Sequence, residues 1–288
     1  MYQDVSTASQ RSSAVSPVVA LLTDFGTSGV FVGVLKGVIA RIAPHAQLID
    51  LTHAVPPQDI ATGMWELEFS YRYFPVGTIF LCIVDPGVGS GRAPIAIHAG
   101  DWYFVGPDNG LFSLILQQQT IHAATALSNP AYRLPHVSST FQGRDLFAPA
   151  AAHLAAGVHL KEFGPFIEPQ QLQRLEIEQP LVVGKDIQAE VIHEDHYGNL
   201  ISNIPASLLP ANGQFFTQPG IRLFLPKRQV IIEQRRRFFA ESPAVEQRKD
   251  EPFLYIDSTN YLGIAVQNGN AAQILGISVG EPITLRLA

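Results

Sequence analysis

The chain has 288 residues, of which 47% are hydrophobic and 15% are charged. This size and composition allow one large buried core or two unequal domains, and they exclude a largely disordered chain. The net charge is -6, and the only dense basic cluster is Arg235-Arg236-Arg237. A broad basic face is therefore missing and no nucleic-acid partner is expected, so we predict that these arginines lie on a solvated strand or loop edge.

Cys82 is the only cysteine, which excludes a disulfide or a cysteine-built zinc site within one chain and favours a reducing compartment. It lies in the apolar run 78–84, where we expect it to fill the core. No apolar stretch approaches the roughly 20 residues that span a bilayer, and the N-terminus lacks the apolar stretch of a secretory signal. We therefore expect a cytoplasmic protein with no membrane partner.

The first half of the chain alternates between short apolar runs and segments with helical spacing. Residues 1–17 are expected to form a flexible tail. Alternation of strands and helices predicts an N-terminal layered α/β domain over residues 18–164, with a largely parallel sheet. The expected strands are 18–22, 47–51, 78–84, 93–98 and 102–105, and the expected helices are 30–42, 59–73, 111–118 and 145–156.

The pattern changes after a polar, proline-punctuated segment at 165–180, which we interpret as an inter-domain linker. Short strands separated by turns then dominate, which predicts a smaller all-β barrel domain over residues 181–288. The expected strands are 187–192, 200–204, 221–224, 230–233, 253–256, 262–266 and 283–287.

Two acidic residues follow predicted strands of the α/β domain. Ligands of open α/β sheets sit beyond the carboxyl ends of strands, and a carboxylate such as Asp24 can accept two hydrogen bonds from a ribose diol. Asp24 could equally cap the following helix. Asp85 opens a glycine-rich turn that ends at Arg92, and the two could polarise one water molecule or form a structural salt bridge. The turn lacks the lysine and hydroxyl residue of a phosphate-binding loop.

Two further segments carry groups suited to binding. Phe141 and Gln142 lie in a polar stretch that leads into a helix, and Phe141 could stack on a flat ring or fill core. Asp195 and Asn199 lie in a turn whose carboxylate and amide suit the ammonium and carboxylate groups of an amino acid. Asp and Asn are also ordinary turn residues, so each segment alone has a plain structural explanation.

Taken in order, these motifs resemble the S-adenosyl-L-methionine hydrolases, also called hydroxide adenosyltransferases, which are relatives of the fluorinating and chlorinating enzymes. The resemblance covers nearly the whole chain from about Val18. It is carried by Thr23-Asp24-Phe25-Gly26, Asp85-Pro86-Gly87-Val88-Gly89 with Arg92, Val105 to Gly110, Thr140 to Asp145, Asp195 to Asn199, and Ser258 to Ala265.

The resemblance implies hydrolysis of S-adenosyl-L-methionine to adenosine and methionine. It also implies a homotrimer whose ligand lies between one subunit's N-terminal domain and a neighbour's C-terminal domain. By this resemblance, Asp85 and Arg92 bind and activate the nucleophilic water, and Asp24 binds the ribose diol. The remaining expected contacts are Phe141 along the nucleoside pocket, Asp195, Asn199 and Ser258 on the methionine portion, backbone groups of Val266 and Asn268 on adenine, and Phe239 where an aromatic is usual.

The chain departs from the family pattern at two positions. Gln142 stands where the hydrolases usually carry a histidine, and a glutamine can orient a water but cannot accept its proton near neutral pH. Gly29 stands where many relatives have Asp. His53 or His136 could supply a replacement base, although packing is the favoured interpretation of each.

The implied chemistry needs no metal or cofactor, because the sulfonium substrate releases methionine as a neutral thioether, and the histidines lack metal-site spacing. Three alternatives stay open. Halide transfer is disfavoured because the halogenating relatives carry Tyr and Thr at the positions of Asp85 and Val88. A non-catalytic or very slow binding protein would follow from the loss of a base at Gln142. A methyltransferase or dinucleotide enzyme would need a Gly-x-Gly-x-x-Gly turn after the first strand, which is missing.

Overall fold

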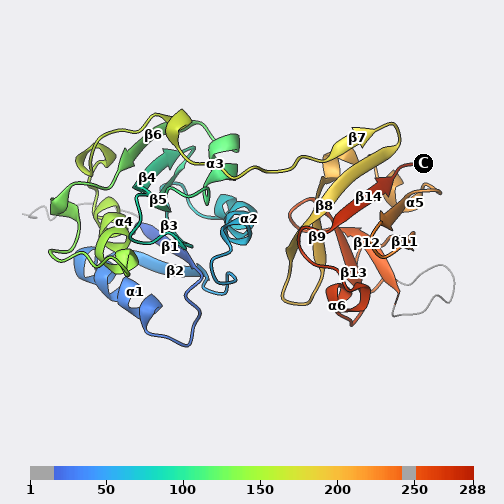
Figure 1. Cartoon of the computed structure of the whole chain (residues 1–288), viewed down its shortest axis with the longest axis horizontal. Helices are drawn as coiled ribbons and strands as arrows, with labels where there is room; N and C mark the ends of the chain where they lie inside the picture. The colour runs from blue at the N-terminus through green and yellow to red at the C-terminus, as the bar shows by residue number, and fades with distance from the viewer. Residues whose placement is uncertain (1–15, 242–250) are drawn as a thin grey trace, which may run out of the picture. The chain divides into compact units, whose positions relative to one another are not determined.

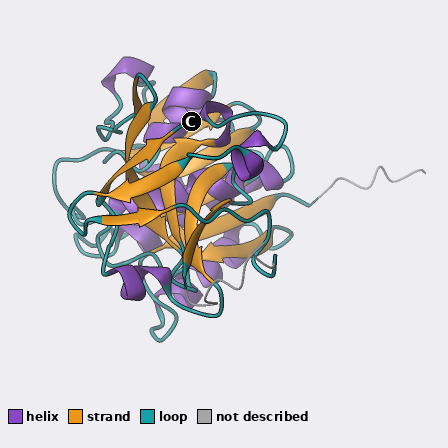
Figure 2. Ribbon diagram, turned by 90° about the vertical axis from the view of Figure 1, so that its right-hand side faces the viewer, coloured by secondary structure: helices purple, strands orange, loops and turns teal. Residues whose placement is uncertain are grey.

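The computed structural model describes residues 16–241 and 251–288, so all but the last two residues of the expected tail lie outside the described residues. The chain divides into two compact units between Leu175 and Glu176 (Figure 1). Helices and strands occur in both, and Figure 2 separates them by colour. Within the described ranges, no helix is long and apolar enough to cross a membrane.

The first unit is built on a six-stranded sheet with the order β2-β1-β3-β5-β4-β6. The pairs β1–β2, β1–β3 and β3–β5 are parallel, whereas β4 runs antiparallel to both neighbours, which confirms the predicted largely parallel sheet. Strand β6 was not predicted, because its alanine-rich sequence has low strand propensity. The strands are β1 (Val18–Thr23), β2 (Gln47–Thr52), β3 (Ile79–Ile83), β4 (Pro94–Ala99), β5 (Trp102–Pro107) and β6 (Ile121–Ala126).

Helices cover both faces of this sheet, as Figure 1 shows. Alternate residues of β1 point to opposite faces, so Val19 and Leu21 pack in one core cluster and Ala20 and Leu22 in the other. Cys82 is fully buried in the second cluster, as predicted. Helices α1 (Phe31–Ile42) and α4 (Ala148–Ala155) pack on the first face, and α2 (Ile60–Ser70) and α3 (Ser113–Gln118) on the second.

The strand order creates a switch point beside β1. The chain leaves β1 for β2 on one side and then returns to β3 on the other side. Strands β1 and β3 are therefore parallel neighbours, and Thr23 is paired with Ile83 at their carboxyl ends. In open α/β sheets this is where ligands bind, so the fold brings the segments after Thr23 and Ile83 to one edge.

Part of the segment interpreted as a linker packs on the first unit. Leu172 is buried among the residues of the second core cluster. The Gln173 amide donates to Asp108 Oδ1 at 2.9 Å, and the Leu175 amide donates to Ser113 Oγ at 2.7 Å. These contacts hold residues 172–175 against the α/β unit.

The second unit is an antiparallel, barrel-like sheet with the order β11-β10-β14-β8-β9-β13-β12, and β7 pairs with β8. Backbone bonds from Arg236 to Leu254 (2.9 Å) and from Leu254 to Gln234 (2.8 Å) link its ends and nearly close it, which confirms the predicted barrel. Its elements are β7 (Leu181–Val183), β8 (Asp186–Glu194), β9 (Leu200–Pro205), α5 (Gln214–Thr217), β10 (Arg222–Leu225), β11 (Val230–Ile232), β12 (Pro252–Ile256), β13 (Tyr261–Val266), α6 (Ala271–Leu275) and β14 (Pro282–Arg286).

The arginine cluster corrects one expectation. Arg236 is only 1% exposed, so the prediction of a solvated edge is wrong for this residue. Its guanidinium donates to the side-chain oxygens of Gln234 and Gln267 and lies 4.3 Å from the centre of the Phe253 ring. A buried cation is tolerated because neighbouring acceptors and an aromatic face replace its water.

Candidate active site

Asp24 follows β1 directly and is partly buried. The backbone amide of Gln58 donates to its Oδ2 atom at 2.8 Å. Helix α1 begins seven residues later and has Val30 as its N-cap, without a side-chain bond. The helix-cap interpretation of Asp24 is therefore wrong, because the intervening loop keeps the carboxylate away from the helix end.

Asp85 and Arg92 form the central ion pair of the site. Arg92 Nε donates to Asp85 Oδ1 at 3.0 Å and Nη2 donates to Oδ2, with the two side chains only 5% (Asp85) and 10% (Arg92) exposed. Arg92 Nη2 also donates to Gln142 Oε1 at 2.6 Å. The structure thus joins the three residues that the sequence nominated for handling water, through one guanidinium group.

The glycine-rich turn shapes this arrangement. Gly89 has a φ of +79°, and a Cβ atom there would lie 2.5 Å from the carbonyl oxygen of Ser139. Only glycine allows the turn to press this closely on the segment that carries Gln142. Asn109 Nδ2 donates to the carbonyl oxygen of Val84 at 2.9 Å and so holds the strand end just before Asp85.

A buried carboxylate that sequence reasoning did not select organises the segment with Phe141 and Gln142. Asp145 is fully buried and accepts bonds from Arg144 Nε at 2.6 Å and from the Ser138 amide at 2.7 Å. Burial acts to raise the pKa of Asp145, but these donors outweigh it and lower the pKa below its usual value. An acidic residue that bonds seven residues back in sequence has no local pattern by which it could be found.

The helix expected at 145–156 begins differently. A π-helical turn spans Gly143–Phe147, and α4 follows from Ala148. The prediction of one regular helix is wrong at its start. Gly143 explains the packing there, since even a Cβ atom would lie 3.3 Å from Ile83 Cδ1. The wide turn directs Gln142, just before it, toward the ion pair; π-helical turns are frequent at functional sites.

A cavity of about 190 Å³ in the first unit has Asp24, Asp85, Phe141 and Gln142 in its lining. Its aromatic wall consists of Phe25, Phe31 and Phe141, whose rings meet edge to face at centroid distances of 5.1–6.2 Å. Sequence reasoning missed Phe31, although an aromatic in the first turn after a strand-end loop is a usable signal. The lining residues are Asp24, Phe25, Phe31, Ile83, Asp85, Val88, Thr140, Phe141, Gln142 and Gly143.

The other six nominated residues belong to the second unit. Asp195 Oδ1 accepts from the amides of Tyr197 (2.8 Å) and Asn199 (2.9 Å), and Oδ2 accepts from Asn199 Nδ2 at 2.8 Å. Asn199 is buried, whereas Tyr197 is 74% exposed. Asp195 and Asn199 therefore stabilise one turn, in which both oxygens of the Asp195 carboxylate accept hydrogen bonds.

Tyr255, which sequence reasoning missed, packs against Phe239. The Phe239 ring lies 5.1 Å from the Tyr255 ring. Burial, together with the charges of Asp195 and Asp257, raises the pKa of the Tyr255 hydroxyl. A β13 glycine, Gly263, makes room for Tyr255, since a Cβ there would lie 2.4 Å from the ring.

The remaining nominated residues lie at strand ends of the barrel. Ser258 is exposed in the turn between β12 and β13, which Asp257 stabilises by accepting from the Tyr261 amide at 2.8 Å. Val266 ends β13 and is buried, and Asn268 follows with a φ of +57°. The turn leaves Asn268 exposed.

The two histidines considered as replacement bases have different surroundings. His53 is buried, is hydrogen-bonded on both ring nitrogens and does not line the cavity, so it has a structural role and is not a replacement base. His136 is exposed in a loop and is not among the residues that line the cavity. Across residues 16–241 and 251–288, no group of three or more His, Cys, Asp or Glu is placed to hold a metal ion.

Comparisons with known proteins agree with this architecture. The model of the SAM hydroxide adenosyltransferase N-terminal domain matches residues 19–164, and that of the C-terminal domain matches residues 189–284. The chain is similar to an (R)-S-adenosyl-L-methionine hydrolase of Salinispora tropica, with 37% identity over 274 residues, 93% of this chain and 97% of the relative. It is also similar to a fluorinase of Actinoplanes, with 26% identity over 95% of this chain and 98% of the relative.

A solved structure is similar over almost the same length. The crystal structure of an uncharacterised conserved protein from Thermotoga maritima has a TM-score of 0.83 and 31% identity, covering 93% of this chain and 100% of that one. The two matched domain models together cover most of the sequence, in the order in which the two folded units occur. This chain therefore belongs to the SAM hydroxide adenosyltransferase family.

Proposed function

We propose that this protein hydrolyses S-adenosyl-L-methionine to adenosine and L-methionine. The observation that carries the proposal is the contact of one guanidinium, that of Arg92, with both Asp85 and Gln142 at the wall of an aromatic cavity. The hydrolase names of relatives at 37% identity support the same reaction. Halide transfer is less favoured, because the fluorinase relative is only 26% identical and Asp85 replaces the Tyr of halogenating enzymes.

The reaction is a displacement at C5′ of the ribose. A water molecule or hydroxide attacks C5′ on the side opposite sulfur, the C–S bond breaks, and methionine leaves as a neutral thioether, so no acid or cofactor is required. The oxygen also loses a proton to solvent. Arg92 favours the negative form of the attacking oxygen and Asp85 aligns it, while the aromatic walls of the cavity reduce competing hydration.

Gln142 takes part as a positioning group. Its Oε1 atom accepts from Arg92, which leaves the side-chain amide hydrogens to donate toward the cavity. A glutamine cannot act as the proton acceptor near neutral pH. The proposal therefore assigns activation of water to the charge of Arg92 rather than to a general base at position 142.

The family membership supports a set of proposed substrate contacts. Asp24 holds the ribose diol, and Phe141 lines the nucleoside pocket together with Phe25 and Phe31. In the second unit, Asp195, Asn199 and Ser258 bind the methionine portion, backbone groups of Val266 and Asn268 meet adenine, and Phe239 adds an aromatic surface. The single cysteine fits the reducing, cytoplasmic setting that the sequence favours.

The site is further proposed to be shared between subunits of a homotrimer. The cavity of about 190 Å³ is smaller than the roughly 300–1,000 Å³ typical of ligand pockets, so the first unit needs additional walls. Light scattering would measure the mass in solution. Mixing inactive Asp85→Asn and Asp195→Ala chains tests the sharing, because regained activity requires sites built from two chains.

Incubation with S-adenosyl-L-methionine and chromatography of the products test the reaction. The protein is expected to release adenosine and methionine in equal amounts, and Asp85→Asn, which keeps the side-chain shape but removes its charge, is the matched control. Adenosine no higher than in that control would refute the hydrolase. A halogenated nucleoside formed in high chloride would instead identify halide transfer.

The same assay separates hydrolysis from binding alone. Tight binding by calorimetry without turnover would support the binding-protein alternative. In that case Gln142→His should raise the rate strongly by supplying a base. If Arg92 is the activating group, Gln142→His should alter the rate little, and the wild-type chain should already be active.

A further inference from the structure

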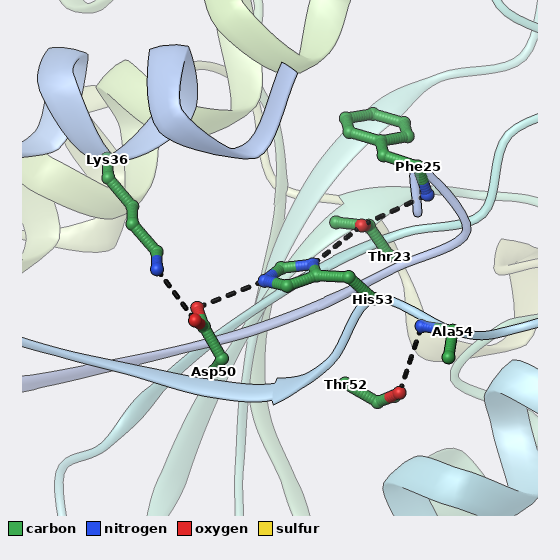
Figure 3. Close-up of polar contacts among 7 residues, drawn as sticks. All are labelled: Thr23, Phe25, Lys36, Asp50, Thr52, His53 and Ala54. Atoms are coloured by element: carbon green, nitrogen blue, oxygen red, sulfur yellow. Dashed lines mark hydrogen bonds and ion pairs between the residues drawn. The ribbon is translucent and has the colours of Figure 1, made fainter. Parts of the chain in front are cut away.

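A network of polar side chains that the proposed reaction does not use runs from Lys36 through Asp50 and His53 to Thr23 (Figure 3). Lys36 Nζ contacts Asp50 Oδ2 at 2.7 Å, Asp50 Oδ1 contacts His53 Nε2 at 3.0 Å, and His53 Nδ1 contacts Thr23 Oγ1 at 2.8 Å. Thr23 in turn accepts from the Phe25 amide at 3.2 Å. This network of side chains joins α1, the end of β2 and the loop after β1.

The hydrogen positions in this network follow from its partners. The Phe25 amide donates to Thr23 Oγ1, so the hydroxyl hydrogen is available for His53 Nδ1. His53 Nε2 donates to Asp50, because the oxygens of a carboxylate only accept. Burial opposes ionisation of Asp50, but the bonds from Lys36 and His53 outweigh it and lower the pKa of this carboxyl, which keeps it a charged acceptor.

The order of Thr23, His53 and Asp50 resembles that of a hydrolytic triad, but exposure excludes that role. Thr23 is fully buried, so no substrate reaches its hydroxyl. The Asp50 side chain is 44% exposed, whereas a triad needs an accessible nucleophile and a buried acid. The network therefore acts on the structure around it.

His53 holds the Asp24 loop on both sides of Asp24. Its ring bonds the residue before Asp24, and its carbonyl oxygen accepts from the amide of Gly26 at 2.9 Å. Gln58 occupies Oδ2 of Asp24, while among the described residues no bond is made to Oδ1. The loop therefore holds Oδ2 of Asp24 in place and leaves Oδ1 available to a ligand in the cavity that Asp24 lines.

Building on the proposed function, we propose that Thr23 and His53 are positioning residues that orient the Asp24 carboxylate for a ribose 2′,3′-diol. Neither residue lines the cavity, so each acts through the loop backbone. Binding of a nucleoside with the diol should depend on this network. Binding of a nucleoside without the diol should not.

The test compares binding of adenosine and 2′,3′-dideoxyadenosine by calorimetry. Thr23→Val keeps the shape but removes the hydroxyl, and it should reduce the preference for adenosine about tenfold, as expected for loss of one buried hydrogen-bond link. Thr23→Ser should keep the preference. Thr52→Val is the matched control, because Thr52 Oγ1 accepts from the Ala54 amide at 3.1 Å in the same way, but its hydroxyl lies outside the series of contacts from Lys36 to Thr23 (Figure 3).

Two further variants keep the test decisive. Asp24→Ala should abolish the preference, and Thr23→Val should add nothing in that background. Lys36→Met perturbs the network from its partly exposed end and should lower the preference less, even if Thr23→Val does not fold. An unchanged preference in Thr23→Val or Lys36→Met, or an equal loss in Thr52→Val, would overturn the positioning role. A wild-type protein that binds neither adenosine nor S-adenosyl-L-methionine would instead refute the proposed function.

Discussion

Replacement of Arg92 by lysine separates the charge of this residue from its geometry. Arg92 makes two hydrogen bonds to Asp85 and one to Gln142, and both members of the ion pair are at most 10% exposed. A lysine keeps the positive charge but cannot form the planar fork. Loss of one charge-assisted hydrogen bond costs about 1.5–3 kcal/mol. If the lost hydrogen bond stabilises the transition state, its loss lowers kcat by about 10- to 150-fold.

The assay is steady-state release of adenosine, with thermal unfolding followed on the same preparations. Arg92→Lys should unfold close to the wild-type temperature, because Asp85 keeps a cation beside it. Arg92→Met is the contrasting variant, and it should lower the free energy of unfolding by about 3–5 kcal/mol because a buried carboxylate loses its partner. An Arg92→Lys enzyme with undiminished kcat would refute the view that the fork holds Asp85 and Gln142 where they align the attacking oxygen.

Three other outcomes are expected. Asp145→Asn should lower the free energy of unfolding by about 1–3 kcal/mol in urea titrations, because Asp145 loses charged bonds to Arg144. Folding lowers the pKa of Asp145, so its charge stabilises the fold above the ordinary carboxyl pKa of about 3.9. This stabilisation is lost as the pH falls through the lowered pKa. Asp145→Asn should therefore weaken the dependence of the free energy of unfolding on acid pH. Gly89→Ala should cost about 1–3 kcal/mol by strain and reduce kcat by displacing Ser139, and equal stability and kcat in that variant would contradict the close approach. Burial raises the pKa of the Cys82 thiol, so a thiol reagent should label it only in denaturant, and labelling of the native protein would show that this strand opens.

Local sequence patterns were sufficient to predict those strands whose burial follows the periodicity of the sequence. The continuous apolar run before Asp24 and the one that contains Cys82 predicted the central strands β1 and β3, which are buried on both faces. The same periodicity failed for β6, which is rich in alanine, and for Arg236, whose burial depends on residues 31 positions away in sequence, such as Gln267. Such contacts form only when the barrel nearly closes.

The site shows the same division. The positions of Asp24 and Asp85 at strand ends could be read from the sequence, because acidic residues directly after apolar runs mark the edge of the sheet. That the two strands are neighbours depends on the order β2-β1-β3, which no local pattern encodes. The π-helical turn after Gln142 likewise depends on the packing of Gly143 against Ile83.

The amino-acid sequence by itself determined the two-part α/β and all-β architecture, the family, and the residue types available for chemistry, because these follow from periodicity, composition and ordered motifs. Only the tertiary structure decided which atoms meet. It joined Arg92 to Asp85 and Gln142, bonded the buried Asp145 to the Ser138 amide, and linked His53 to Thr23 across 30 residues. The physical reason is that hydrogen bonds and ion pairs of this kind depend on distances of about 3 Å between segments that are remote in sequence, which are set by the packing of the whole core.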